Sequence, residues 1–156
     1  MSGNSGGNRP ALGEILALAI RPASGIPMES RDTIELTSKE GVVGDFGKSM
    51  KRQVTILSLE DWEESILEVA DSSLDWTTRR AQVLVTGVEL RGFVGKTISL
   101  GTSRVTILGE VPPCYKMEGV CEGLEQALSP NWRGGVYGKV NESGVVRVGD
   151  VLTEIK

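Results

Sequence analysis

The sequence predicts one mostly β domain with a few helices, of the α+β class, whose short strands close wholly or partly into a barrel. Glycine makes up 20 of the 156 residues, well above its usual share of about 7%. These glycines separate short segments rich in β-branched residues, a pattern typical of strands joined by tight turns. One segment changes to a helical period, and no linker divides the chain after residue 11.

Strands are predicted where β-branched residues lie between turn signals. In chain order they cover residues 13–20, 33–37, 53–58, 82–86, 96–100, 104–108, 135–141 and 151–155. Two phrases that look alike, GVVGD at 41–45 and GVVRVGD at 144–150, are interpreted as turns. Residues 1–11 are rich in Gly, Ser and Asn and are predicted to be a disordered leader, so the folded domain covers residues 12–156.

The first helix is predicted after the strand at residues 53–58. Leu59, Trp62, Ile66 and Val69 recur at spacings of three and four, which places them on one apolar face. Ser58 is the expected N-cap, and acidic residues crowd the first turn. This helix is expected to cover the barrel, with Trp62 in the core. A second, short helix is predicted over residues 118–128.

Composition excludes several classes of function. The net charge of −4, without a basic run longer than two residues, argues against nucleic-acid binding. The longest apolar stretch, residues 15–20, is far too short to cross a membrane. Two cysteines without an export signal indicate a reducing, cytoplasmic location. Histidine is absent, so His-based catalytic triads and His-ligated metals are excluded. A metal bound here would have to bring most of its ligands with it.

Cys114 is the residue best placed for chemistry. Pro112 and Pro113 stiffen the backbone before it, and a short helix is predicted to follow. The free N–H groups at a helix N-terminus stabilise a thiolate, which is the form that binds metals and sulfur. The alternative is a buried, inert cysteine.

Cys121 lies seven residues after Cys114. Seven helical residues span about 10.5 Å, beyond the limit of about 7 Å between Cα atoms for a disulfide. A helix break at Gly119 would bring the two thiols closer together. The favoured interpretation of Cys121 is a small buried hydrophobic residue.

Several cations stand at the entrances to strands and would converge at one rim of a barrel. Lys51 and Arg52 precede one strand, Arg79 and Arg80 precede another, and Arg133 precedes two glycines. The arginine fork is suited to a phosphate or a pterin-like anion. Taken singly, each arginine is more often a solvated surface charge. Asp45 is more often a turn residue than a ligand.

Taken together, eight phrases of the sequence resemble the MOSC domain, the module named after the C-terminal part of molybdenum-cofactor sulfurases. They cover about residues 12 to 155 in the order GEI (13–15), GVVGD (41–45), RQVTIL (52–57), TRR (78–80), VTGVEL (85–90), PC (113–114), RGGVY (133–137) and GVVRVGD (144–150). Each phrase alone is weak, but eight in this order are specific. The resemblance implies a single-domain, MOSC-type β-barrel with a few covering helices.

The resemblance also implies binding of the molybdenum cofactor (molybdopterin) or handling of its sulfur. In members that reduce N-hydroxylated compounds, the cysteine matching Cys114 is a thiolate ligand of molybdenum. Basic residues hold the pterin phosphate, and Arg80 matches the arginine of an Arg-x-Asn phrase. Two positions depart from the pattern and put activity in doubt: Gly47 replaces a histidine, and Gln82 replaces the asparagine.

Three functions follow from these observations. In the first, Cys114 ligates molybdenum, while Asp45, Arg52, Arg80, Gln82 and Arg133 hold the cofactor, and small N-oxygenated substrates are reduced with electrons from a redox partner. In the second, Cys114 carries a persulfide received from a cysteine desulfurase. In the third, the barrel is a non-catalytic partner-binding module.

Overall fold

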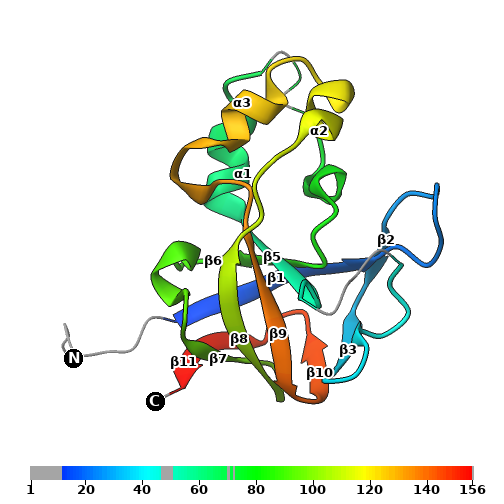
Figure 1. Cartoon of the computed structure of the whole chain (residues 1–156), viewed down its shortest axis with the longest axis vertical. Helices are drawn as coiled ribbons and strands as arrows, with labels where there is room; N and C mark the ends of the chain where they lie inside the picture. Colours follow the sequence, from blue (N-terminus) through cyan, green and yellow to red (C-terminus); the bar gives the residue numbers. More distant parts are fainter. Residues whose placement is uncertain (1–11, 47–50, 70, 72, 156) are drawn as a thin grey trace.

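The computed structural model describes residues 12–46, 51–69, 71 and 73–155, so the predicted leader and Gly47 lie outside the described residues. Strands build a barrel with the helices gathered at one end (Figure 1). The strands are β1 Leu12–Ile20, β2 Glu29–Arg31, β3 Thr33–Thr37, β4 Gly41–Val42, β5 Val54–Ser58, β6 Val83–Thr86, β7 Thr97–Leu100, β8 Ser103–Glu110, β9 Val136–Glu142, β10 Gly144–Arg147 and β11 Val151–Ile155. The α-helices are α1 Leu59–Ile66, α2 Tyr115–Val120 and α3 Leu124–Leu128, and short 3₁₀ turns cover Trp76–Arg79, Leu90–Phe93 and Pro130–Trp132.

Among the described residues, seven strands close the barrel in the order β11-β7-β8-β9-β5-β6-β1, and β11 pairs with β1 to complete the ring. The β5–β6 pair is parallel, whereas the other neighbouring strands of the ring run antiparallel. A parallel pair needs a crossover connection, and here α1 and the Trp76–Arg79 turn supply it. The predicted fold class, a mostly β barrel with a few helices, is confirmed.

A second, three-stranded sheet in the order β10-β3-β4 flanks the barrel. It corrects the sequence-based prediction that residues 41–45 and 144–150 are only turns, because each phrase opens with a strand. β4 and β10 pair with the two edges of β3. The turns lie in the second half of each phrase, where Gly44 and Gly149 have φ angles of +82° and +94°.

Two apolar clusters hold the fold together. The first fills the barrel and includes Ile15, Ile56 and Val105. The second lies between the barrel and the helices, where Leu57 meets Trp62 of α1. Strand β5 thus contributes to both clusters from alternate residues, as the period of a strand requires, and Trp62 is the core residue that its spacing predicted.

The first helix is confirmed, with Ser58 as its N-cap: the Ser58 Oγ accepts a hydrogen bond from the Asp61 N–H at 3.2 Å. The second helix is not continuous over residues 118–128, as predicted, but is divided into α2 and α3. The break lies at residues 121–123, where Gly123 has a φ of +86°, and not at Gly119, which is inside α2. None of the helices in the described part of the chain has the length and apolar composition needed to cross a membrane.

Candidate functional site

Cys114 lies in the connection between β8 and α2, directly before the helix. It is the N-cap residue of α2, and its carbonyl accepts a hydrogen bond from the Met117 N–H at 2.9 Å. The side chain is exposed and is not part of a disulfide. The expected position before a helix is therefore confirmed, and the alternative of a buried cysteine is wrong.

Arg79 lies beneath the connection that carries Cys114. Its guanidinium is buried and donates from Nε to the Gly134 carbonyl at 3.1 Å and from Nη2 to the Val111 carbonyl at 2.7 Å. The pKa of Arg79 lies below its ordinary value, mainly because the side chain is buried. The charge of Cys114 acts in the opposite direction and raises this pKa, whereas the charge of Arg52 lowers it further. Arg79, Cys114 and Arg52 are thus close enough to interact electrostatically, although sequence reasoning did not select Arg79 as a site residue.

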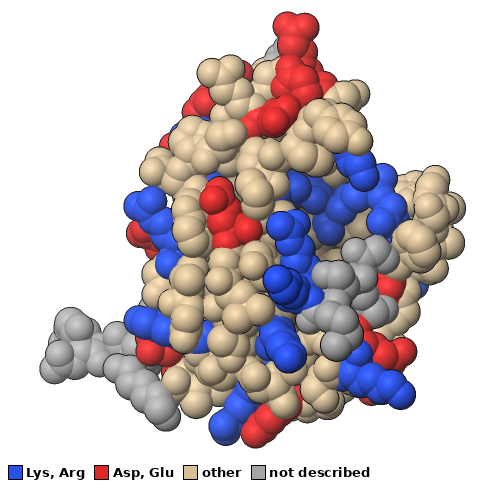
Figure 2. All heavy atoms as spheres, viewed as in Figure 1, with Lys and Arg blue, Asp and Glu red and all other residues tan. Residues whose placement is uncertain are grey.

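A basic pocket of about 190 Å³ opens beside this cluster. It is lined by Arg21, Met28, Asp45, Phe46, Arg52, Thr55, Arg80 and Gln82. The fold therefore brings together four residues that the sequence predicted, namely Asp45, Arg52, Arg80 and Gln82. Figure 2 shows a group of Lys and Arg side chains right of the centre of this face, with further cations along its left and lower edges, and several acidic side chains at the helical end at the top.

Sequence reasoning missed Arg21, the third arginine of the basic pocket. Arg21 directly follows the end of β1 and precedes a proline, so it stands at the exit of a strand and not at an entrance. Because β1 and β6 are antiparallel, the end of β1 lies beside the start of β6, which Arg80 precedes.

The polar side chains of the pocket form a buried network that joins three strands. The Asp45 carboxylate accepts hydrogen bonds from the Arg21 N–H at 2.8 Å and from the Gln82 Nε2 at 3.1 Å. The Gln82 Oε1 in turn accepts from the Thr55 N–H at 2.8 Å. Asp45 and Gln82 are both buried. Because a buried network of satisfied polar groups is rigid, these two residues fix the strand ends from which the arginines project.

The arginines of the pocket are held in different ways. Arg52 stacks over the Tyr137 ring with its guanidinium carbon 5.1 Å from the ring centroid, and Arg21 stacks over Phe46 at 5.5 Å. Arg80 has a φ of +64° and follows the Trp76–Arg79 turn. This left-handed residue changes the direction of the chain, so consecutive arginines separate: Arg79 is buried, and Arg80 is exposed and lines the pocket.

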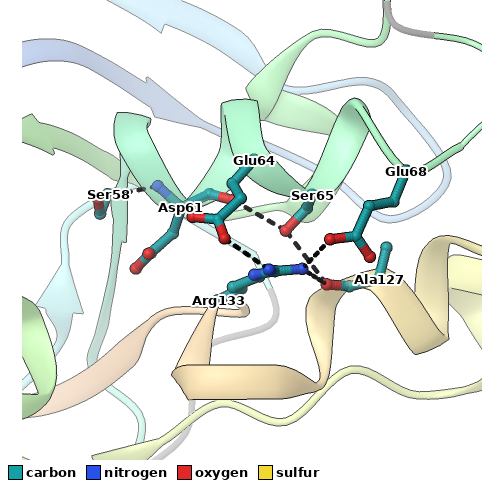
Figure 3. A network of polar contacts seen from close by, with 7 residues as sticks. All are labelled: Ser58, Asp61, Glu64, Ser65, Glu68, Ala127 and Arg133. Atoms are coloured by element: carbon teal, nitrogen blue, oxygen red, sulfur yellow. Dashed lines mark hydrogen bonds and ion pairs between the residues drawn. The ribbon is translucent and has the colours of Figure 1, made fainter.

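Arg133 lies elsewhere, beneath α1 (Figure 3). Its guanidinium forms ion pairs at 2.7 Å with Glu64 and at 2.7 Å with Glu68, and it donates to the Ala127 carbonyl at 2.9 Å. Burial lowers the pKa of Arg133, but the hydrogen bonds to Glu68 and Glu64 outweigh this effect and raise it. Arg133 is not among the residues that line the basic pocket, so its part in phosphate binding stays a prediction.

A larger, acidic cavity of about 420 Å³ lies beside α1 and the end of β6. Its lining includes Glu60, Asp61, Glu64 and Glu89. Burial, followed by the charge of Glu64, raises the pKa of Asp61 to about 6. Four carboxyl groups make this cavity unsuited to an anion, so the smaller basic pocket is the better candidate for a phosphate.

Cys121 does not take part in the basic pocket. It is half-buried and packs against the apolar cluster under the helices, as expected for a small hydrophobic residue. Within the described ranges, no group of three or more His, Cys, Asp or Glu side chains is arranged to hold a metal ion.

Comparison with known proteins identifies the family. A family model described as the MOSC domain matches residues 43–153. In structure, the chain is similar to YuaD from Bacillus subtilis, with a TM-score of 0.78 and 20% identity over 92% of this chain and 96% of that one. It is also similar to YiiM from Geobacillus stearothermophilus, with a TM-score of 0.74 and 15% identity over 92% of this chain and 75% of that one.

YiiM from Escherichia coli is a further structural neighbour, with a TM-score of 0.63 and 17% identity over 92% of this chain and 70% of that one. No curated protein matches the chain in sequence. At these low identities the structural neighbours establish the fold alone, whereas the family model covers more than half of the residues. The chain therefore belongs to the MOSC domain family.

Proposed function

We propose that the protein binds the molybdenum cofactor, with the Cys114 thiolate as a ligand of the metal and with Arg52, Arg80 and Arg21 around the phosphate of the pterin. The observation that carries this proposal is an exposed thiol within electrostatic reach of Arg79, which in turn interacts with Arg52, and Arg52 lines one pocket with Arg21 and Arg80. Family membership supports it, because the MOSC domain is associated with this cofactor.

The size and charge of the basic pocket fit the phosphate of the cofactor. Its volume of about 190 Å³ is below the roughly 300–1,000 Å³ of pockets that enclose a whole drug-sized ligand. A phosphate fits within such a space, whereas the remainder of a pterin would extend beyond it. Three guanidinium groups can neutralise a phosphate dianion and orient it by bidentate hydrogen bonds. The buried Asp45–Gln82 network would keep the pocket in shape before the ligand arrives.

The donor chemistry of Cys114 also fits. A thiolate is a soft ligand, and the thiol of Cys114 is exposed. The cofactor would supply two-electron redox chemistry at molybdenum, and the protein would hold and orient it. The substrates proposed on this basis are small N-hydroxylated compounds, each reduced to an amine and water with two electrons from a redox protein and two protons.

The test is metal and pterin analysis of protein purified from a host that makes the cofactor and from one that does not. We expect molybdenum and pterin only in the first preparation, and their loss in Cys114→Ala. Cys121→Ala is the matched control, because that thiol is half-buried against the apolar cluster under the helices, and it should retain the metal. A molybdenum content that is unchanged in Cys114→Ala would contradict ligation by this residue.

A persulfide carrier is the second candidate, and the exposure of Cys114 favours it, because sulfur transfer needs a thiol that a partner enzyme can reach. The Cys114 thiolate would attack the outer sulfur of a desulfurase persulfide, gain that sulfur and release the desulfurase thiolate. Incubation with a cysteine desulfurase and cysteine should then add about 32 Da to Cys114. If neither molybdenum nor sulfur is found on the protein, the barrel is a non-catalytic partner-binding module.

A further inference from the structure

The guanidinium of Arg79 joins two connections that are distant in sequence. One is the segment after β8, through the Val111 carbonyl, and the other is the segment before β9, through the Gly134 carbonyl. The two segments also touch directly, because a Cβ built on Gly134 would lie 2.5 Å from the Val111 oxygen and 3.0 Å from Nη2 of Arg79. A glycine is therefore needed at residue 134 for this close approach.

Arg79 is also a buried positive charge that forms no ion pair with a carboxylate among the described residues. Its guanidinium donates to two neutral carbonyls, and Arg79 is 8% exposed. An arginine stays protonated even when it is buried. The Cys114 thiol is first among the charges that stabilise this cation, ahead of Glu110. The Val111 carbonyl that Arg79 holds lies three residues before Cys114, so this cation is within electrostatic reach of the thiol-bearing connection.

We propose that Arg79 is a positioning residue for Cys114, which ties the thiol-bearing connection to the start of β9 and sets a fixed positive charge beside the sulfur. The inference rests on the proposed function, in which Cys114 is the reactive group. The positive charges of Arg79 and Arg52 together favour negative charge at the Cys114 sulfur. We therefore expect the ligand or partner group that approaches this sulfur to be anionic.

The test uses the protein without cofactor and compares two alkylating reagents at one pH. Iodoacetate is an anion and iodoacetamide is neutral, and both attack the thiolate, so the ratio of their rates at Cys114 does not depend on how much thiol is ionised. A Cys121→Ser background leaves one reactive thiol, and free cysteine provides the reference ratio. We expect iodoacetate to be favoured at Cys114 relative to free cysteine, and this preference to weaken at high salt.

Two substitutions separate charge from tethering. Arg79→Gln should lower the ratio of iodoacetate to iodoacetamide rates about threefold to fivefold, because one nearby cation is lost. Arg79→Lys keeps the positive charge but loses the planar guanidinium that reaches both carbonyls. The ratio of iodoacetate to iodoacetamide rates should therefore stay within about twofold of its value in the protein with Arg79. Arg79→Lys should instead speed amide hydrogen exchange at residues 111–118 and 133–136. Arg104→Gln is the matched control, because Arg104 lies about 23 Å from residue 111 along β8 and should change neither measurement.

The proposal is overturned if Arg79→Gln leaves the rate ratio unchanged. It is also overturned if exchange rises equally throughout β5 and β6, since Arg79 would then be a general core residue and not a local tether. Because these measurements need no metal, they stand even if the protein fails to bind molybdenum, so the two proposals can fail independently.

Discussion

Arg79 and Arg133 are both buried arginines, yet their surroundings differ in one decisive respect. Arg133 forms ion pairs with two carboxylates, Glu64 on α1 and Glu68 just after that helix. Arg79 donates to two backbone carbonyls, which satisfy N–H groups but carry no net negative charge. A neutralised guanidinium serves to join elements of the fold. A guanidinium that keeps its positive field can act on a thiol or a ligand beside it.

The same contrast separates the acidic cavity and the basic pocket described above. Carboxyl groups dominate the cavity beside α1, whereas arginines dominate the pocket near Cys114. Both lie close to the parallel strands β5 and β6, so the shape of the barrel alone does not decide which one receives an anion. The sign of the charge does. Substitutions that change charge at constant shape are therefore the best way to test this comparison.

The largest effect is expected when Arg133 loses its partners. In the double variant Glu64→Gln/Glu68→Gln, a buried cation would be left without a counter-charge. Breaking such a pair costs roughly 3–5 kcal/mol when both partners are buried. The two glutamates are 60% and 50% exposed, so we expect the free energy of unfolding to fall by about 2 kcal/mol. Urea denaturation at pH 7 measures this. Glu63 is exposed on the same helix, and the Glu63→Gln variant should keep nearly the same free energy of unfolding as the unmodified protein. If this control lost as much stability as the double variant, the ion-pair explanation would be contradicted.

The next effect concerns the arginines of the basic pocket. Inorganic phosphate is a suitable probe, with its Kd measured at constant ionic strength. Arg52→Gln or Arg80→Gln should each weaken phosphate binding about tenfold, because a charge-assisted hydrogen bond is lost. Arg91→Gln removes the same charge from the lining of the acidic cavity and should leave the Kd within about twofold. Equal weakening in all three variants would mean that phosphate responds to the overall charge and not to the pocket.

The smallest effect is a pH dependence at Asp61, in the acidic cavity. Its pKa in the folded protein is about 6, above the ordinary value of 3.8, so folding favours the protonated carboxyl. That contribution to stability is fully present below about pH 4 and is lost as the pH rises to about 6. Because Asp61 is only half-buried, we expect Asp61→Asn to gain about 1 kcal/mol over the unmodified protein between pH 4 and pH 7. Parallel stability curves for the two proteins would show that the carboxyl titrates normally.

Much of the fold could be predicted from local patterns. The strands that build the barrel have dense β-branched segments, and α1 has both a clear apolar period and a serine cap. The missed strands β2, β4 and β10 are only two to four residues long, too short for a period to be recognised. The break between α2 and α3 depends on a single left-handed glycine, Gly123. The sequence analysis considered a break only at Gly119, and nothing local indicated that Gly123 would adopt the left-handed conformation instead.

The site was predictable only in part, because it depends on contacts between distant segments. The positions of Arg52 and Arg80 before strands correctly predicted that the two residues would converge. The starts of the neighbouring parallel strands β5 and β6 meet at one rim of the barrel. Which of two consecutive arginines would be buried depended on the left-handed backbone of Arg80, and nothing local indicated it. The carboxylates around Arg133 come from α1 and the turn after it, more than 60 residues earlier in the chain, so its pairing could not be inferred from its neighbours in sequence.

The pairing of β11 with β1 has a consequence for how the protein is made. Leu12 lies opposite Thr153, so the first and last described strands share a single seam. During translation the ring cannot be completed until residues 151–155 have left the ribosome, and until then β1 and β7 each present an open edge. Until this strand has been made, the two open edges expose the chain to aggregation through strand pairing.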